Sequence, residues 1–203
     1  MGARGRGTGA DPQAGAVPAS FARALDSLHG VELRPEVSIE ETPAPQRLSP
    51  FAVAIQAEVL LANDDDADEA ASGRFVLLHD PDGQEPWDGQ FRLVTFAKGT
   101  VELDIASDPM LTEVAWSWLL EALEERGAQF RAESGTVTRT ASQSFGAIGE
   151  RPPQGDVEVR ASWTPATDDI GPHLQAWSDV LSRIAGLPPL PPGVSSLLLS
   201  RRR

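Results

Sequence analysis

The spacing of apolar residues along the chain alternates between the period of a strand and the period of a helix. Over residues 51–61, every second side chain from Phe51 to Leu61 is apolar or small, which predicts a strand with one buried face. Over residues 108–126, apolar side chains recur three and four positions apart, which predicts an amphipathic helix that ends at Gly127. The chain therefore contains both kinds of element.

Further segments of both kinds complete the pattern. Helices are predicted over residues 20–30 and from Pro172 to Gly186. Strands are predicted over residues 31–39, 74–79, 90–96, 130–141 and 156–163, and the alternation after residue 96 continues through Val101, Leu103 and Ile105. Because successive strands joined by short turns pair antiparallel, we predict an α+β fold. It is a single domain, with a twisted, mainly antiparallel sheet and about three helices packed mostly on one face.

Composition separates one folded body from polar segments. Residues 1–17 offer almost nothing to bury and are predicted to form a disordered tail, and residues 191–203 a flexible basic tail. Residues 18–190 form the predicted α+β domain, within which the acidic stretch 63–73 is predicted to be a mobile loop.

The net charge of −13 is unevenly distributed. Residues 1–17 carry a net +1 and residues 194–203 carry +3, which leaves −17 on residues 18–193. A body this acidic repels phosphate backbones, so we expect no nucleic-acid partner and a surface suited to a basic protein. A weaker alternative is an RNA-associated regulatory protein that uses its Arg-rich tails.

Composition also excludes several kinds of chemistry. The chain has no cysteine, which rules out disulfides, thiolate zinc sites and cysteine nucleophiles. No apolar run approaches the ~20 residues of a membrane span, and no secretory signal is present, so we expect a cytoplasmic protein without a membrane partner. The sequence contains no phosphate-binding glycine loop, no nucleophile elbow and no metal-binding histidine spacing. We predict no metal and no cofactor.

The polar cluster His79, Asp80 and Asp82 is the candidate for chemistry. A histidine beside carboxylates can bind a ligand or transfer protons, and Arg92 would join the site if the register allowed it. The turn interpretation competes with this one, because Asp-Pro-Asp-Gly is also what a tight turn requires. Trp87 is a candidate partner anchor in a loop, or else a lid on the sheet; we expect Trp87→Ala to keep the fold and weaken partner capture.

The remaining aromatic and histidine residues receive structural interpretations. Trp116, Trp118, Trp163 and Trp177 lie on predicted buried faces, and Trp118→Ala should cost ~3–5 kcal/mol if the ring is enclosed. His29 and His173, at the end of one predicted helix and the start of another, are expected at the surface or in caps.

Several segments together resemble one family. They read "RPEVSIEETPAPQRLSPFAVAIQAEV", "GRFVLLHDPDGQEPWDGQFRLVTF", "DPMLTEVAWSWLLEAL", "SGTVTRTASQSFG", "VEVRASWTP" and "AGLPP". Over roughly residues 18–190 the chain resembles the actinobacterial family catalogued as domain of unknown function number 3000. The resemblance implies an actinobacterial source, and it implies no activity, cofactor or site residue.

Two classes of function remain open at this point. The sequence favours a non-catalytic binding or adaptor module with a protein partner, for which Trp87, His79, Asp80, Asp82 and Arg92 are the candidate binding residues. The alternative is an enzyme with a small polar site around His79, Asp80 and Asp82. A pocket around His79 would favour the enzyme, and an apolar patch around Trp87 the adaptor.

Overall fold

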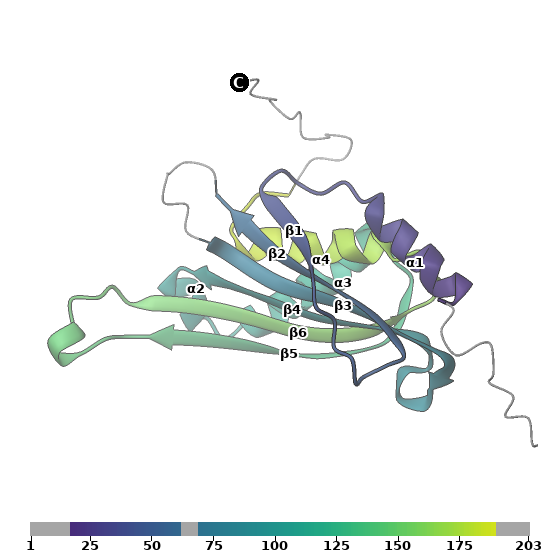
Figure 1. The fold of residues 1–203 in the computed structure, drawn as a ribbon. Helices are drawn as coiled ribbons and strands as arrows, with labels where there is room; N and C mark the ends of the chain where they lie inside the picture. The colour runs from purple at the N-terminus through teal and green to yellow at the C-terminus, as the bar shows by residue number, and fades with distance from the viewer. Residues whose placement is uncertain (1–16, 62–68, 190–203) are drawn as a thin grey trace, which may run out of the picture.

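Six antiparallel strands form one sheet, in the order β1-β2-β3-β4-β6-β5, in the computed structural model, which describes residues 17–61 and 69–189 (Figure 1). The strands are β1 (Val37–Thr42), β2 (Phe51–Leu60), β3 (Glu69–Gln84), β4 (Gly89–Val101), β5 (Phe130–Ser142) and β6 (Gln154–Pro165). The helices are α1 (Ala19–His29), α2 (Leu103–Ser107), α3 (Leu111–Glu125) and α4 (Gly171–Ile184). The predicted α+β class is confirmed, with the five-residue α2 as a fourth helix.

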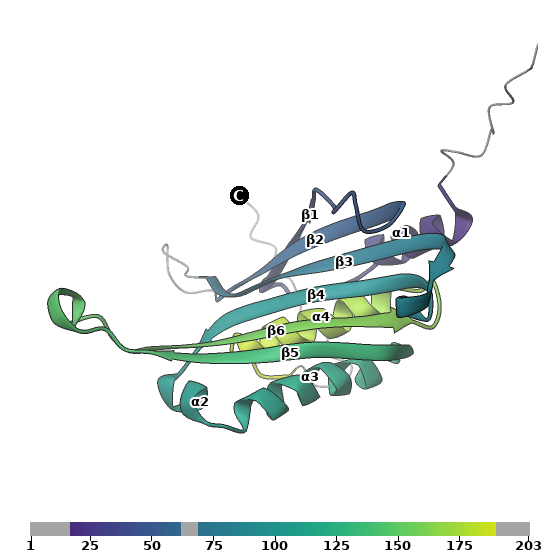
Figure 2. The same cartoon turned by 90° about the horizontal axis from the view of Figure 1, so that it is seen from below.

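The strand register divides the sheet into a covered and an open face. On β2, β3, β4 and β6, alternate residues face α3 and α4, and Figure 2 shows these helices together on one side of the sheet. Aligned across the middle strands, Leu77, Leu93 and Trp163 belong to this buried layer. The residues between them face away from the helices. One side of the sheet therefore builds the core, while the other carries a mixture of polar and apolar side chains.

Helix α4 packs so closely on the sheet that its largest side chain requires a glycine opposite. A Cβ atom on Gly73 of β3 would lie 2.6 Å from the ring of Trp177 and 2.4 Å from the carbonyl oxygen of Phe96. The indole N–H of Trp177 donates a hydrogen bond to that same carbonyl, at 3.2 Å. Trp177 is fully buried, so it holds α4 directly beneath the centre of the sheet.

Two predicted strand boundaries differ from those in the structure: the start of the strand predicted over residues 31–39 and the end of the alternation predicted through Ile105. The strand predicted over residues 31–39 starts only at Val37, since Pro35 lies in a turn in which Val37 N–H donates to the Arg34 carbonyl. Among the described residues, the pairing of β4 ends at Val101, and Leu103 and Ile105 belong to α2 instead of extending the strand. Strand β1 lies at the edge of the sheet, where a nearby proline removes no ladder hydrogen bond.

The acidic stretch 63–73 was predicted as a loop, and its second half is not one. Strand β3 begins at Glu69, and Ala71 pairs with Val59 on one side and Gly99 on the other. Pairing with two neighbours outweighs the low strand propensity of this composition. Residues 63–68 lie outside the described residues, as do the predicted tails except for Val17 at one end.

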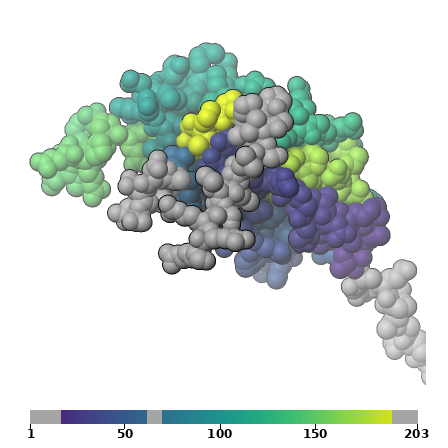
Figure 3. Space-filling view, turned by 90° about the horizontal axis from the view of Figure 1, so that it is seen from above, coloured from purple at the N-terminus to yellow at the C-terminus, as the bar shows by residue number. Residues whose placement is uncertain are grey.

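The β5–β6 hairpin projects beyond the rest of the molecule, opposite the end that carries α1 (Figure 3). Phe145 and Ile148, near its tip, are both exposed. Over residues 17–61 and 69–189, no helix combines the length and the hydropathy that crossing a membrane demands.

Candidate binding site

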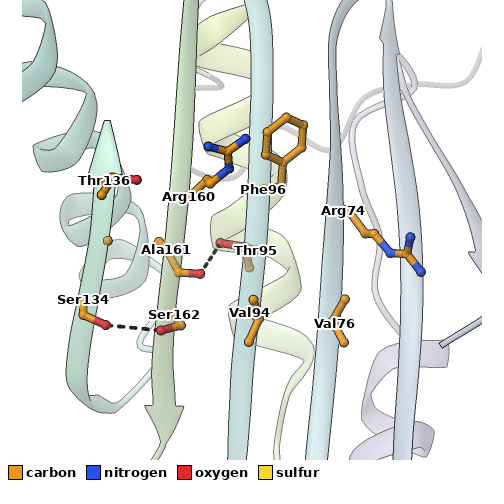
Figure 4. Close-up of a pocket in the computed structure, with 11 residues that line it drawn as sticks. Arg74, Val76, Val94, Thr95, Phe96, Ser134, Thr136, Arg160, Ala161 and Ser162 are labelled. Carbon is orange, nitrogen blue, oxygen red and sulfur yellow. Dashed lines mark hydrogen bonds between the residues drawn. The ribbon is translucent and has the colours of Figure 1, made fainter. Parts of the chain in front are cut away.

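The open face of the sheet carries a groove of about 540 Å³ that crosses β3, β4, β6 and β5 (Figure 4). Its floor is apolar: Val76 of β3 lies opposite Val94 of β4, and Phe96 follows two residues further on. Val94 is 39% exposed, although it lies near the middle of the sheet. Strands are spaced ~4.8 Å apart, so a groove across four of them is about 14 Å long. The volume lies within the ~300–1,000 Å³ range of small-molecule sites, and the groove is shallow and open to solvent.

Two arginines flank the floor. The guanidinium of Arg160 lies 5.5 Å from the centre of the Phe96 ring, and it also pairs with Glu158 at 2.8 Å. Arg74 lies on the other side of Phe96 and donates to the carbonyl of Pro43 at 2.6 Å. None of the residues lining the groove is acidic, although acids outnumber bases in the whole chain. Two arginines and no acidic residue thus line the groove, and Glu158 beside it balances the charge of Arg160.

A buried arginine lies at the hydroxyl end of the groove. Arg92 of β4 is 8% exposed, and all of its hydrogen-bond partners among the described residues are neutral. Nη2 donates to the hydroxyls of Ser162 (2.7 Å) and Ser134 (3.3 Å), while Nη1 donates to the Ala132 carbonyl (2.8 Å) and to Thr164 (3.1 Å). Burial lowers the pKa of Arg92, yet a guanidinium keeps its proton in proteins.

A bulge in β5 supplies one of these acceptors. Arg131 pairs with Thr164 and Ser134 with Ser162, so β5 contains one extra residue here. Ala132, inside the bulge, has a φ of +53°, a conformation that a residue with a Cβ atom rarely adopts. Its carbonyl is thereby turned toward Arg92. The strained backbone at Ala132 thus supplies a hydrogen-bond acceptor for the buried guanidinium of Arg92.

We expect Ala132→Gly to raise the free energy of unfolding by about 0.5–1 kcal/mol, because glycine adopts a positive φ without the steric cost. Ala141→Gly, further along the same strand, should lower it by a similar amount, since its backbone is extended. Urea unfolding measures both. Equal destabilisation by the two substitutions would contradict a strained bulge.

His79 lies on the covered face, away from the groove. It pairs with Phe91 across the strands, and the two rings stack with centroids 4.3 Å apart. Its Nδ1–H donates to the Gln90 carbonyl (3.1 Å), which leaves Nε2 to accept from the Ser20 hydroxyl (3.3 Å). Burial lowers its pKa, and the side chain has no solvent-exposed surface. Its contacts are those of a neutral core histidine.

The other members of the predicted polar cluster are dispersed. Asp80 accepts hydrogen bonds from the Asp82 backbone N–H and the Gln84 side chain, both at 3.1 Å, which is a local turn arrangement. Arg92 pairs with Leu78 across the strands, so its side chain lies on the face opposite His79. The structure therefore does not bring Arg92 and His79 together. Their predicted joint role rested on a register that the sequence does not specify.

Trp87 is half-buried rather than freely exposed. Its ring packs against Ala54, Val76 and Leu78 on the open face, and its carbonyl accepts a hydrogen bond from the Thr164 hydroxyl. Since Val76 also lines the groove, Trp87 covers the part of the open face next to it. This position corresponds to the predicted lid.

His173 was expected at the surface, and that expectation is wrong. It is buried in α4, and its Nδ1 accepts a hydrogen bond from the Trp163 indole at 3.0 Å. Burial lowers the pKa of His173 to about 4. The sequence does not show whether residue 173 lies on the exposed or the buried face of its helix. Only the packing of α4 on the sheet shows that it lies on the buried one.

Sequence reasoning singled out Arg92 but missed its hydroxyl partners and the groove. A signal for them exists: Arg92, Val94 and Phe96 alternate on one face of β4 between the buried Phe91, Leu93 and Thr95. The described residues contain no group of three histidine or acidic side chains arranged to hold a metal ion.

The fold and the groove define an α+β protein whose open antiparallel sheet carries a partly apolar groove lined by two arginines. Comparison with protein families places the chain more narrowly: the model of the family described as "Protein of unknown function (DUF3000)" matches residues 17–195, and the chain belongs to this family. The resemblance found in the sequence is confirmed, and the actinobacterial source that it implies stays a prediction. Comparisons with curated proteins and with solved structures found no match.

Proposed function

We propose that this protein is a non-catalytic binding module that holds its partner molecule on the open face of the sheet. The observation that supports this is the groove over Val76, Val94 and Phe96, where solvent-accessible apolar surface lies between two arginines. Apolar surface that a fold leaves uncovered beside directed polar groups is typical of binding sites. The partner chemistry differs from the sequence expectation, because a groove lined by two arginines and no acidic residue favours an anionic molecule over a basic protein.

The environment of His79 gives the enzyme alternative no support. A general acid or base must come within hydrogen-bond reach of a substrate, and both ring nitrogens of His79 already have partners inside the covered face. The Asp80 carboxylate accepts hydrogen bonds from the Asp82 backbone N–H and from the Gln84 side chain, within a local turn. A binding role needs only the shape and charge of the open face.

Blocking the groove floor tests this function. In Val94→Glu, a carboxylate replaces an exposed apolar side chain at the centre of the groove, and we expect the variant to fold and to lose its bound molecules. Thr100→Glu adds the same charge to the same strand and face outside the groove, and should retain them. Affinity purification of each full-length chain, with proteins and small molecules identified by mass spectrometry, is the measurement.

A set of co-purifying molecules that is the same for both variants and the wild type would contradict binding on the open face. Trp87→Ala is a less specific test than Val94→Glu, because removing the ring also uncovers Ala54 and Leu78. A smaller loss of bound molecules is expected for it, with the fold intact.

A further inference from the structure

The uncompensated charge of Arg92 points to the chemistry of the ligand, if the open face binds one as proposed above. Taking a guanidinium out of water costs several kcal/mol unless an anion or a full set of hydrogen bonds replaces the water. Arg92 has hydrogen bonds, but among the described residues it forms no ion pair. The site therefore has positive charge that a bound anion would neutralise.

Ser134 and Ser162 link the buried Arg92 guanidinium to the surface of the groove through hydrogen bonds. A hydroxyl that accepts from Arg92 must donate its own hydrogen elsewhere, and both Ser134 and Ser162 accept from Nη2. The two hydroxyl oxygens lie 3.2 Å apart, so one donates to the other. The second hydrogen is then available to the groove, which both serines line (Figure 4). An acceptor placed there would be held by a polarised donor above a buried cation.

The rest of the groove suits an apolar body. From the serines, the floor passes over Val94 and Val76 to Phe96, which provides an apolar surface beside the anion position. A volume of about 540 Å³ accommodates a small organic molecule. The groove runs across the strands, so an extended peptide lying in it would make no ladder hydrogen bonds with them.

We propose that the groove binds a small amphipathic anion, whose carboxylate or phosphate oxygens lie at Ser134 and Ser162 above Arg92 and whose apolar part lies over Val76, Val94 and Phe96. This assignment rests on the proposed binding function and specifies its ligand class. Arg74, further along the groove, adds a second positive charge, whereas the charge of Arg160 is shared with Glu158.

A set of eight-carbon probes separates charge from apolar contact. Octanoate, octyl phosphate and 1-octanol are titrated into the full-length chain, and the amide signals of Ser134, Ser162 and Val94 are followed by nuclear magnetic resonance. We expect both anions to bind at least tenfold more tightly than the alcohol. The ratio of octanoate to octyl phosphate affinity shows which head group the site prefers.

Ser134→Asp provides an internal competitor. The new carboxylate lies beside Arg92 and occupies the anion position, so octanoate affinity should fall at least tenfold, octanol affinity should stay unchanged, and the thermal midpoint should rise. Ser142→Asp, on the same strand and face but opposite the neutral Gln154 and outside the groove, is the charge-matched control and should change none of the three. The expected rise in stability also shows that any loss of binding does not come from unfolding.

Three other results would contradict the inference, and each identifies which part of it is wrong. Equal binding of octanol and octanoate, with no effect of Ser134→Asp, would leave an open-face binding module without an anion site. If no probe shifts these amides and Val94→Glu also leaves the co-purifying molecules unchanged, the proposed function itself fails. If pentaglutamate shifts the same amides more strongly than the octyl probes, the occupant is an acidic protein segment and not a small molecule.

Discussion

Replacing Trp177 with alanine is expected to lower the free energy of unfolding by ~3–5 kcal/mol, a loss typical of a large aromatic ring removed from a core. The ring is 1% exposed, lies 5.6 Å from the Phe75 ring and fits against Gly73. Its removal leaves a cavity under β3 and β4 and deprives the Phe96 carbonyl of its indole donor. Urea unfolding followed by far-ultraviolet circular dichroism measures the loss without relying on tryptophan emission.

Trp118→Ala is the matched control. The large cost predicted for it from the sequence required an enclosed ring, and the Trp118 ring is not enclosed. The sequence placed Trp118 among the buried rings, but the structure leaves it only half-buried on α3. A cost of about 1–2 kcal/mol is expected there, because part of the ring already contacts water. If Trp118→Ala proves as costly as Trp177→Ala, the described partial exposure of Trp118 on α3 is wrong.

Stability should fall by about 2–3 kcal/mol between pH 7.5 and 4.5 on account of His173 alone. Its pKa is about 4 in the folded protein, against ~6.5 for an unfolded chain. Below pH 6.5, His173 becomes protonated in the unfolded state but stays neutral in the folded state. Lowering the pH therefore favours unfolding until the folded pKa is reached. Above that window the contribution is constant. Burial lowers the pKa of His79 as well, and its contribution has the same sign.

The variant His173→Asn isolates this effect. The asparagine amide oxygen can accept the Trp163 N–H as the histidine Nδ1 does, and it does not titrate. Free energies of unfolding in urea at several pH values should decline less steeply for the variant, with the gap between the slopes confined to pH 4–6.5. Wild-type and variant curves that run parallel would show that His173 does not titrate as its burial requires.

Local sequence signals were sufficient for most elements. The alternation from Phe51 predicted β2 to within one residue, and the spacing over residues 108–126 predicted α3. These predictions succeed because the periodicity reflects the face that must leave water, whatever covers it. They fail where a neighbouring strand decides, as at Glu69, where β3 begins inside an acidic stretch, and after Val101, where pairing ends.

The candidate site was accessible to sequence reasoning only in part. Alternation placed Arg92 on the face opposite Phe91 and Leu93, which the structure confirms. Its partners, Ser134 and Ser162, come from strands about 40 and 70 positions further along the chain. Which of several serines on β5 and β6 meets Arg92 depends on strand order and on the bulge at Ala132, and neither leaves a local signal.

The sequence by itself determined the α+β class and the absence of cysteine chemistry, because these depend on short-range periodicity and composition. It also determined the family, because the motifs that carry the resemblance lie along the chain. Only the tertiary structure decided that His79 and His173 are core residues, that Trp87 covers the open face and that two arginines line the groove there. The physical reason is that charge and burial at a site are set by which strands lie side by side, and an alternating sequence is compatible with several such orders.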